Sequence, residues 1–225
     1  MVARVLGALF LCACIPAFAQ SDDLALGKLL VASRDLGDPN FAKAVILLVR
    51  YEQDKGAVGL VLNKRTDVPL SRVFGDLKEA SGRTDPIYIG GPVELNTVQA
   101  LFKSGSKPQG ADRVFGDVYL ISNKDALTRT LAARAEAEVF HAYVGYAGWG
   151  AGQLEHEIEL GAWHIMPADA GTVFHADPDS VWPRLIQRTE THIARAPISV
   201  DFGASPRLPF SILEKDSHGL ALILQ

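Results

Sequence analysis

The chain has 225 residues, and 48% of them are hydrophobic, which is enough apolar material for one sizeable buried core. It carries 22 lysine and arginine residues against 26 aspartate and glutamate residues, for a formal net charge of −4. Nucleic-acid binders depend on basic clusters that neutralise phosphates, and the longest basic cluster here is the pair Lys64-Arg65. The composition therefore excludes nucleic acid as an expected partner.

The N-terminal segment has the features of a secretory signal peptide. Arg4 supplies a positive charge, an apolar run covers residues 5–15, and Ala17-Phe18-Ala19 fits the small-x-small pattern of a cleavage site. We therefore expect cleavage after Ala19 and export, with the periplasm as the compartment. The run is shorter than the roughly 20 apolar residues of a membrane-spanning helix, so no membrane span is expected. Two alternatives remain: a cytosolic protein that keeps this segment, or a lipid-anchored one, since residues 11–14 loosely resemble a lipobox.

Cysteine is confined to the predicted signal peptide, at Cys12 and Cys14. A mature chain that begins at Gln20 contains no cysteine. We therefore expect no disulfide, no thiol nucleophile and no cysteine-ligated zinc. The stability of the mature protein must come from its buried core.

Two apolar runs predict the centre of a sheet. Residues 44–49 form a continuous apolar run, which is typical of a strand buried on both faces, and residues 58–62 form a second run after the turn at residues 53–56. Together they predict a central β-hairpin. Next along the chain, the spacing of Leu70, Val73, Phe74 and Leu77 predicts a helix over residues 70–77.

The remaining elements alternate between strands and helices. We expect a helix capped by Ser122, with Asp125 completing a capping-box variant. A helix over residues 181–189 is expected to begin after Ser180, which places Pro183 at its third position. Further elements are expected as strands at residues 87–89, 97–102, 118–121, 139–146 and 163–166, and as a helix at residues 153–160 with Leu154 and Ile158 turned inward. Residues 191–225 are expected to be a C-terminal extension that packs on the core or trails from it, and residues 220–224 are a candidate edge strand.

Several motifs occur in a specific order and resemble one known family. They are Asp38-Pro39-Asn40-Phe41, Gly59 to Asn63, Tyr88 to Val93, Gly145 to Glu155, and Ala162-Trp163 followed by Pro167-Ala168-Asp169. Over roughly residues 27–190 the chain is similar to the YqgE/AlgH family of small bacterial proteins. The resemblance implies a single α+β domain, α/β-like and three-layered, with a bent, barrel-like mixed sheet surrounded by helices. It implies no enzymatic activity, because the family has none established, although a regulatory role has been proposed for some members. Family members usually lack a signal peptide, and this chain departs from that pattern.

The glycine-rich segment at residues 145–152 and the acidic segment after it do not match a known catalytic motif. The glycine spacing is neither G-x-G-x-x-G nor a P-loop, so a tight strand-to-helix turn is the favoured interpretation, with an anion at the helix amides as the alternative. Glu155-His156-Glu157 lacks the second histidine of a zinc helix, because position 160 is Leu160. We therefore expect no metal and no cofactor.

Polar residues and glycines at the ends of predicted strands form a candidate ligand site. It comprises Asn40, Asn63, Gly90, Gly91, Trp149, Gln153 and Glu157. The leading hypothesis is a non-enzymatic binding or regulatory domain of the cell envelope, whose partner is a small molecule or an envelope protein. A competing hypothesis is a hydrolase with Glu157 or Asp38 as base and Asn63 as oxyanion donor. A third is that these residues only stabilise turns. If the N-terminal segment is not a signal, a cytosolic transcription-linked regulator becomes the alternative.

Overall fold

The computed structural model describes residues 24–75, 77–133 and 139–195 of the chain. The predicted signal peptide at residues 1–19 and the C-terminal extension from residue 196 onward lie outside these ranges. Within them, no helix is long and apolar enough to span a membrane.

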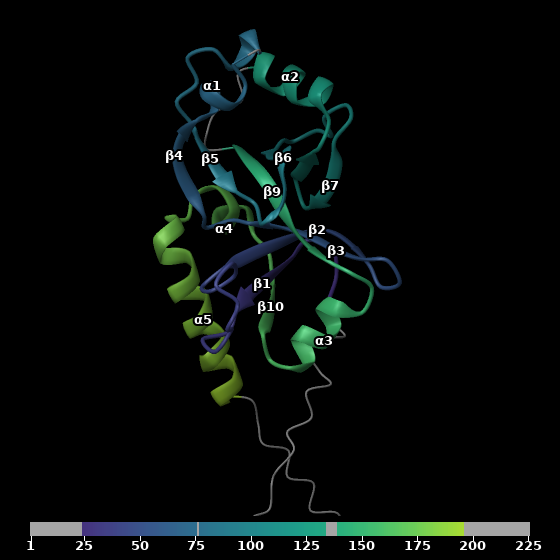
Figure 1. Ribbon diagram of the computed structural model, residues 1–225, viewed down its shortest axis with the longest axis vertical. Helices are drawn as coiled ribbons and strands as arrows, with labels where there is room; N and C mark the ends of the chain where they lie inside the picture. Colours follow the sequence, from purple (N-terminus) through teal and green to yellow (C-terminus); the bar gives the residue numbers. More distant parts are fainter. Residues whose placement is uncertain (1–23, 76, 134–138, 196–225) are drawn as a thin grey trace, which may run out of the picture. The chain divides into compact units, whose positions relative to one another are not determined.

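The described elements alternate along the chain (Figure 1). The strands are β1 (Lys28–Ala32), β2 (Val45–Glu52), β3 (Gly56–Val61), β4 (Arg65–Pro69), β5 (Pro86–Ile89), β6 (Val93–Lys103), β7 (Asp112–Phe115), β8 (Val118–Ile121), β9 (Phe140–Trp149) and β10 (Trp163–Pro167). The helices are α1 (Leu70–Val73), α2 (Lys124–Ala132), α3 (Gln153–Glu159), α4 (Ala170–Phe174) and α5 (Pro178–Arg195), with a 3₁₀ turn at Lys78–Ala80.

The strands form one curled sheet in the order β10-β1-β2-β3-β9-β6-β8-β7, to which β4 and β5 are joined through β9. Every pairing is antiparallel except that of β5 with β9, so the sheet is mixed. The sheet curls far enough for Gly27, just before β1, to lie against Val114 and Phe115 of the edge strand β7. The prediction of a single α+β domain with a bent, barrel-like mixed sheet is confirmed in its half-barrel form.

Strand β9 is the central strand, because it pairs with three others. Its residues 142–144 lie between β5 and β6, whereas its residues 147–149 pair with residues 57–59 of β3. The change of partner falls at Gly145, whose φ of 67° lies in the left-handed region that favours glycine. In Figure 1, β9 runs from β5 and β6 toward β2 and β3. One strand therefore connects the two parts of the sheet.

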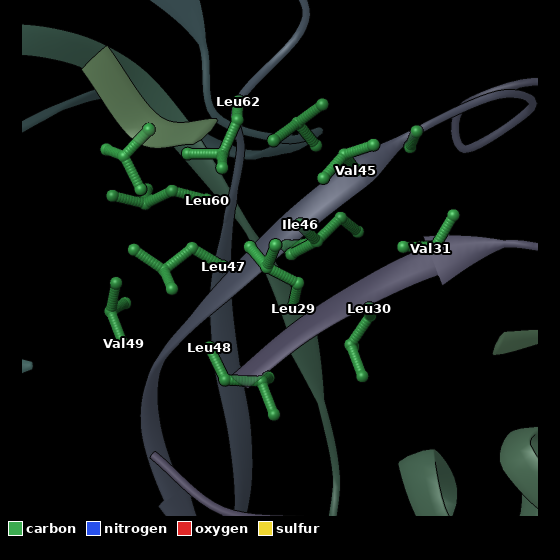
Figure 2. Close-up of a cluster of buried hydrophobic side chains, with 14 of the residues drawn as sticks. Leu29, Leu30, Val31, Val45, Ile46, Leu47, Leu48, Val49, Leu60 and Leu62 are labelled. Carbon is green, nitrogen blue, oxygen red and sulfur yellow. The ribbon is translucent and has the colours of Figure 1, made fainter. Parts of the chain in front are cut away.

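Buried apolar side chains form two clusters. The larger, which we call the hairpin cluster, is built on β1, β2 and β3, and Figure 2 shows Ile46, Leu47 and Leu48 of β2 with their neighbours from β1 and β3. Helices α3 and α5 contribute to it through their apolar faces. The smaller, which we call the α2 cluster, includes Leu127 of α2 and Phe140 of β9. The predicted central hairpin is confirmed, since Ile46 and Leu48 are fully buried within the sheet.

Predicted boundaries of three helices, α1, α2 and α5, are wrong. Helix α1 ends at Val73 rather than Leu77, and glycine at position 75 disfavours its continuation. The N-cap of α2 is Asn123, not Ser122, because the Asn123 side chain accepts the amide of Ala126 at 2.8 Å.

Helix α5 begins at Pro178 rather than after Ser180, and continues to Arg195, past the predicted end at Thr189. Proline is well tolerated at a first helical position, where its missing amide would be unpaired. Pro183 consequently lies inside the helix, where it removes one hydrogen bond. Burial of Trp182, Leu185 and the other apolar residues of the same face offsets that loss.

The glycine-rich segment is also organised differently from the predicted turn. Strand β9 continues through Gly145 to Trp149, so only residues 150–152 form the turn into α3. The sequence-based prediction missed the short elements β1, β4, β7 and α4, which have four or five residues each and carry little periodicity.

Candidate functional site

Gly90 and Gly91 lie where β9 exchanges one partner strand for another. The amide of Gly90 donates to the carbonyl of Val144 at 2.8 Å, and its carbonyl accepts the amide of Val61 at 2.8 Å. These bonds join the end of β3 to β9 through the turn that follows β5. A Cβ on Gly90 would collide with the carbonyl oxygen of Gly145, and one on Gly91 would collide with the next residue of β9. Both glycines therefore allow the turn after β5 to pack closely against the backbone of β9 at residues 145–146.

The carboxylate of Glu157 holds three structural elements together. Its Oε2 atom accepts the indole N–H of Trp149 at 3.0 Å and that of Trp163 at 2.8 Å. Its Oε1 atom accepts the Nε2–H of Gln153, one turn earlier on α3, at 3.0 Å. The Gln153 Oε1 atom in turn accepts the amide of Gly150 at 3.1 Å. The end of β9, the start of β10 and helix α3 thus share one hydrogen-bonded group.

Three aromatic rings cover this carboxylate. The Phe41 ring stacks on Trp149 with centroids 6.2 Å apart, and it meets the edge of Trp163 at 5.9 Å. The two indoles lie edge to face with centroids 6.1 Å apart. Each separation falls within the range in which aromatic pairs attract one another. Trp149 and Trp163 are buried and Phe41 is only partly buried, so Phe41 is the accessible ring of the three.

The loop that carries Phe41 is fastened to the hairpin by Asn63. The Asn63 Oδ1 atom accepts the amide of Val45 at 2.9 Å, and its Nδ2 atom donates to the carbonyl of Lys43 at 2.9 Å. Lys43 needs this support because its φ of 57° is unusual for a residue other than glycine. Within the loop, the carboxylate of Asp38 accepts the amide of Asn40 at 2.8 Å. The side-chain amide of Asn63 is therefore engaged with backbone groups on both sides.

The structure brings the seven candidate residues to β9 and its neighbours, but not to a single constellation. Trp149, Gln153 and Glu157 form one hydrogen-bonded group, and Asn40 adjoins it through Phe41. The Asn63 side chain is hydrogen-bonded to the backbone of the Phe41 loop, and the Gly90–Gly91 turn packs against β9 at Gly145. Phe41 was not among the candidates, although it follows Asn40 directly in the Asp38–Phe41 motif. That adjacency was the signal by which it could have been found.

The arrangement offers little for hydrolysis or metal binding. Glu157 receives three donors, Asp38 accepts a backbone amide of its own turn, and Asn63 is fully engaged. No group of three or more histidine, cysteine, aspartate or glutamate side chains in the described ranges is placed to hold a metal ion. His156 and Glu159 lie on the solvated face of α3, as the helical spacing predicted.

His141 is a perturbed titratable group that the sequence did not single out. It lines a cavity of about 210 Å³, and its ring stacks on Tyr88 with centroids 4.7 Å apart. Burial, with a smaller contribution from nearby His175, lowers the pKa of His141 to about 4, although Asp85 opposes the shift. The imidazole is therefore neutral at physiological pH. Nothing in the scattered histidines of the sequence distinguished this position.

The family model described as AlgH-like matches residues 29–194, which include the whole site described above. The chain belongs to the AlgH-like family. Among its relatives, a UPF0301 protein of Streptomyces coelicolor is 34% identical over 174 residues, covering 75% of this chain and 88% of the relative. A UPF0301 protein of Chlorobaculum tepidum is 33% identical over 162 residues, covering 72% of this chain and 84% of the relative.

Solved structures agree with this AlgH-like fold. The solution structure of the AlgH protein from Pseudomonas aeruginosa superimposes with a TM-score of 0.60 at 30% identity, covering 76% of this chain and 93% of that one. The crystal structure of a protein from Corynebacterium diphtheriae gives a TM-score of 0.62 at 24% identity, covering 74% and 87% of the two chains. These names state no activity, so the family assignment establishes the fold and not a reaction.

Proposed function

We propose that this AlgH-like protein is an exported, non-enzymatic binding domain that acts in the cell envelope. Its binding face, in this proposal, is formed by Asn40, Phe41 and the exposed turn at residues 150–153. The observation that carries the proposal is that the Glu157 carboxylate accepts hydrogen bonds from two indole N–H groups and one side-chain amide. A carboxylate committed to three donors within the protein acts as a frame for the surface above it, whereas a general base must be open to its substrate.

The chemistry of this face favours a polar partner with an apolar edge. Asn40 is exposed, and its side-chain amide can donate and accept hydrogen bonds. Phe41 supplies the accessible aromatic surface, and the glycines of the 150–152 turn leave backbone groups uncovered by side chains. Asn63, Gly90 and Gly91 belong to the supporting frame rather than to the contact surface. A segment of an envelope protein, or a small neutral polar molecule, has the matching chemistry.

The N-terminal sequence supports the compartment in this proposal. Residues 1–19 have the charge, apolar run and small-residue cleavage site of a signal peptide. A mature chain free of cysteine needs no thiol–disulfide maintenance outside the cytoplasm. Intact mass of the native protein should therefore begin at Gln20, and a cytosolic species that retains residues 2–19 would contradict the compartment.

A site-specific photocrosslinker tests the binding face. We expect a crosslinker at Asn40 to capture a discrete partner in living cells, because this residue is exposed beside Phe41. The matched control places the same crosslinker at Lys107, an exposed residue in a different loop. Equal capture from both positions, or none from Asn40, would contradict the proposed face.

Gln153→Ala separates a binding role from scaffolding. Under the proposal this substitution abolishes complementation of a deletion strain and changes the free energy of unfolding by less than about 1 kcal/mol, as is typical of a surface change. Full complementation, or ready unfolding of the variant, would mean that Gln153 only braces the turn.

A further inference from the structure

A second cavity, remote from the Glu157 group, lies beside the α2 cluster. Its volume is about 330 Å³, which is within the range of small-molecule sites. Most of its wall is apolar and comes from the α1 region, β6, β8 and α2. These side chains are Val73, Phe74, Leu77, Val98, Ile121 and Leu127.

The α2 cluster beside this cavity differs in composition from the hairpin cluster. Five of the twelve buried residues assigned to this cluster are alanines, at positions 80, 100, 111, 126 and 142. In the hairpin cluster, by contrast, only four of the thirty-two assigned residues are alanines. Val73, at the cavity wall, is 37% exposed, although it is a large aliphatic residue.

A bulge in β6 places a polar residue at the mouth of this cavity. The pairing of β6 with β9 shifts between Val93 and Val98, so residues 94–97 are extruded from the ladder. Glu94, within the bulge, has a φ of 46°, which is strained for a residue other than glycine. Bulges next to functional sites redirect side chains, and this one brings Asn96 to the cavity.

The charge at the mouth is positive. Lys124 is the one charged side chain among the described residues that line the cavity, and it is the first residue of α2. The N-terminal end of a helix favours negative charge, and an ammonium group adds to that preference. The amide of Asn123 is engaged with Gly110 and Ala126, which leaves Asn96 and Lys124 as the groups that can meet a ligand.

We propose that this cavity binds a small amphiphilic carboxylic acid. The apolar tail lies against Val73, Val98 and Leu127, and the carboxylate is held at Lys124 and Asn96. The volume admits a medium-chain acyl group and not a two-chain phospholipid. The apolar wall and the single positive charge select this class together, since a cation would be repelled and a sugar would leave polar groups unpaired on the wall.

Calorimetric titration of the full protein with fatty acids below their micellar concentrations tests the proposal. From hexanoate to decanoate, affinity should rise about fourfold for each added methylene, as expected from the transfer of apolar surface out of water. Decyltrimethylammonium should not bind, and decanol should bind more weakly than decanoate. Absence of saturable decanoate binding would overturn the proposal, and equal binding of decanol would overturn the role of the carboxylate.

Two substitutions locate the binding. Lys124→Glu should weaken decanoate about tenfold or more and leave decanol unchanged, since it reverses one charge at the mouth. Lys107→Glu, an equal charge reversal outside the cavity, is the control and should change neither. Val73→Trp fills the cavity from a partly exposed position and should abolish binding of both. If Val73→Trp binds decanoate as the unmodified protein does, or if Lys107→Glu weakens it equally, the cavity is not the site.

Discussion

The hairpin cluster and the α2 cluster show two ways of building a core within one domain. The hairpin cluster is dominated by leucine, isoleucine, valine and tryptophan, and some of its members also form hydrogen bonds with the backbone. For example, the indole N–H of Trp182 donates to the carbonyl of Ala32 at 2.8 Å. The α2 cluster is smaller and rich in alanine, and a cavity of about 330 Å³ adjoins it. The hairpin cluster is therefore built mainly from large side chains, whereas the α2 cluster has many small ones and a cavity beside it.

The largest expected difference between the clusters is in the cost of truncation. Ile46→Ala in the hairpin cluster should lose about 2–5 kcal/mol of unfolding free energy, because it creates a void in a fully buried strand. Leu127→Ala in the α2 cluster should lose about 2 kcal/mol, the low end of the same range, because Leu127 already borders open volume. Urea unfolding of both variants measures the two losses. The contrast between clusters fails if Leu127→Ala is the more destabilising change.

His141 lies between the clusters, and its protonation provides a second test. Its pKa is lowered to about 4 in the folded protein, below the ordinary value near 6.5, mainly because of burial. The unfolded chain therefore binds the proton more tightly than the folded one. Above about pH 6.5 the imidazole is neutral in both states and the folded protein is not penalised. As the pH falls from about 6.5 through 4, protonation of the unfolded chain lowers the free energy of unfolding by roughly 3 kcal/mol.

Replacement of the imidazole isolates this contribution. His141→Phe keeps an aromatic ring against Tyr88 and Phe174 and removes the titratable group. The difference in unfolding free energy between pH 7 and pH 4.5 should be smaller in His141→Phe than in the unmodified protein. Equal pH dependence of the unfolding free energy in the two proteins would show that the pKa of His141 is not lowered in the folded protein.

Removal of the Glu157 carboxylate is expected to destabilise the hairpin cluster specifically, because Trp149 and Trp163 belong to that cluster. Glu157→Ala leaves the indole N–H groups of Trp149 and Trp163 without their acceptor, which costs about 1–3 kcal/mol for each group that stays buried and unpaired. Glu159→Ala is the matched control, since Glu159 is exposed two residues along α3, and it should change stability by less than about 0.5 kcal/mol. Thermal unfolding and tryptophan fluorescence report the two variants. Similar behaviour of both variants would contradict the bracing role of Glu157.

The sequence predicted those parts of the fold in which burial follows a simple period. The continuous run at residues 44–49 identified the buried strand β2, and the spacing of Leu154 and Ile158 identified the inner face of α3. Phe74 and Leu77, whose spacing predicted a helix, pack against the α2 cluster as partly buried residues, although α1 ends at Val73. In these cases a side chain's own hydrophobicity decides where it lies.

The parts that the sequence did not predict depend on tertiary contacts. Gly145 and Gly148 were assigned to a turn, whereas the pairing of β9 with β3 holds this segment extended. The choice between Ser122 and Asn123 as N-cap could not be made locally, since both residue types cap helices well. The candidate site was predicted as a group of polar residues and glycines at strand ends; in the structure these residues lie at β9 and its neighbours without forming one constellation, and the ligand site stays a prediction. The spacing of residues alone did not show that the side chain of Asn63 would bind the backbone of residues 43 and 45, or that Glu157 would accept hydrogen bonds from Trp149 and Trp163, because both arrangements depend on how the strands and α3 pack together.

The threefold pairing of β9 also constrains the order in which the protein can form. Its partners β3 and β5 precede it by more than fifty residues along the chain, so these pairings cannot form until the polypeptide extends to Trp149. Pairings between such distant segments form slowly, because the intervening loop must first be closed against its entropy. A newly made chain would therefore remain unfolded through most of its synthesis. Under the export proposed above, such a delay would keep the chain extended for passage through a translocation channel before the sheet has closed.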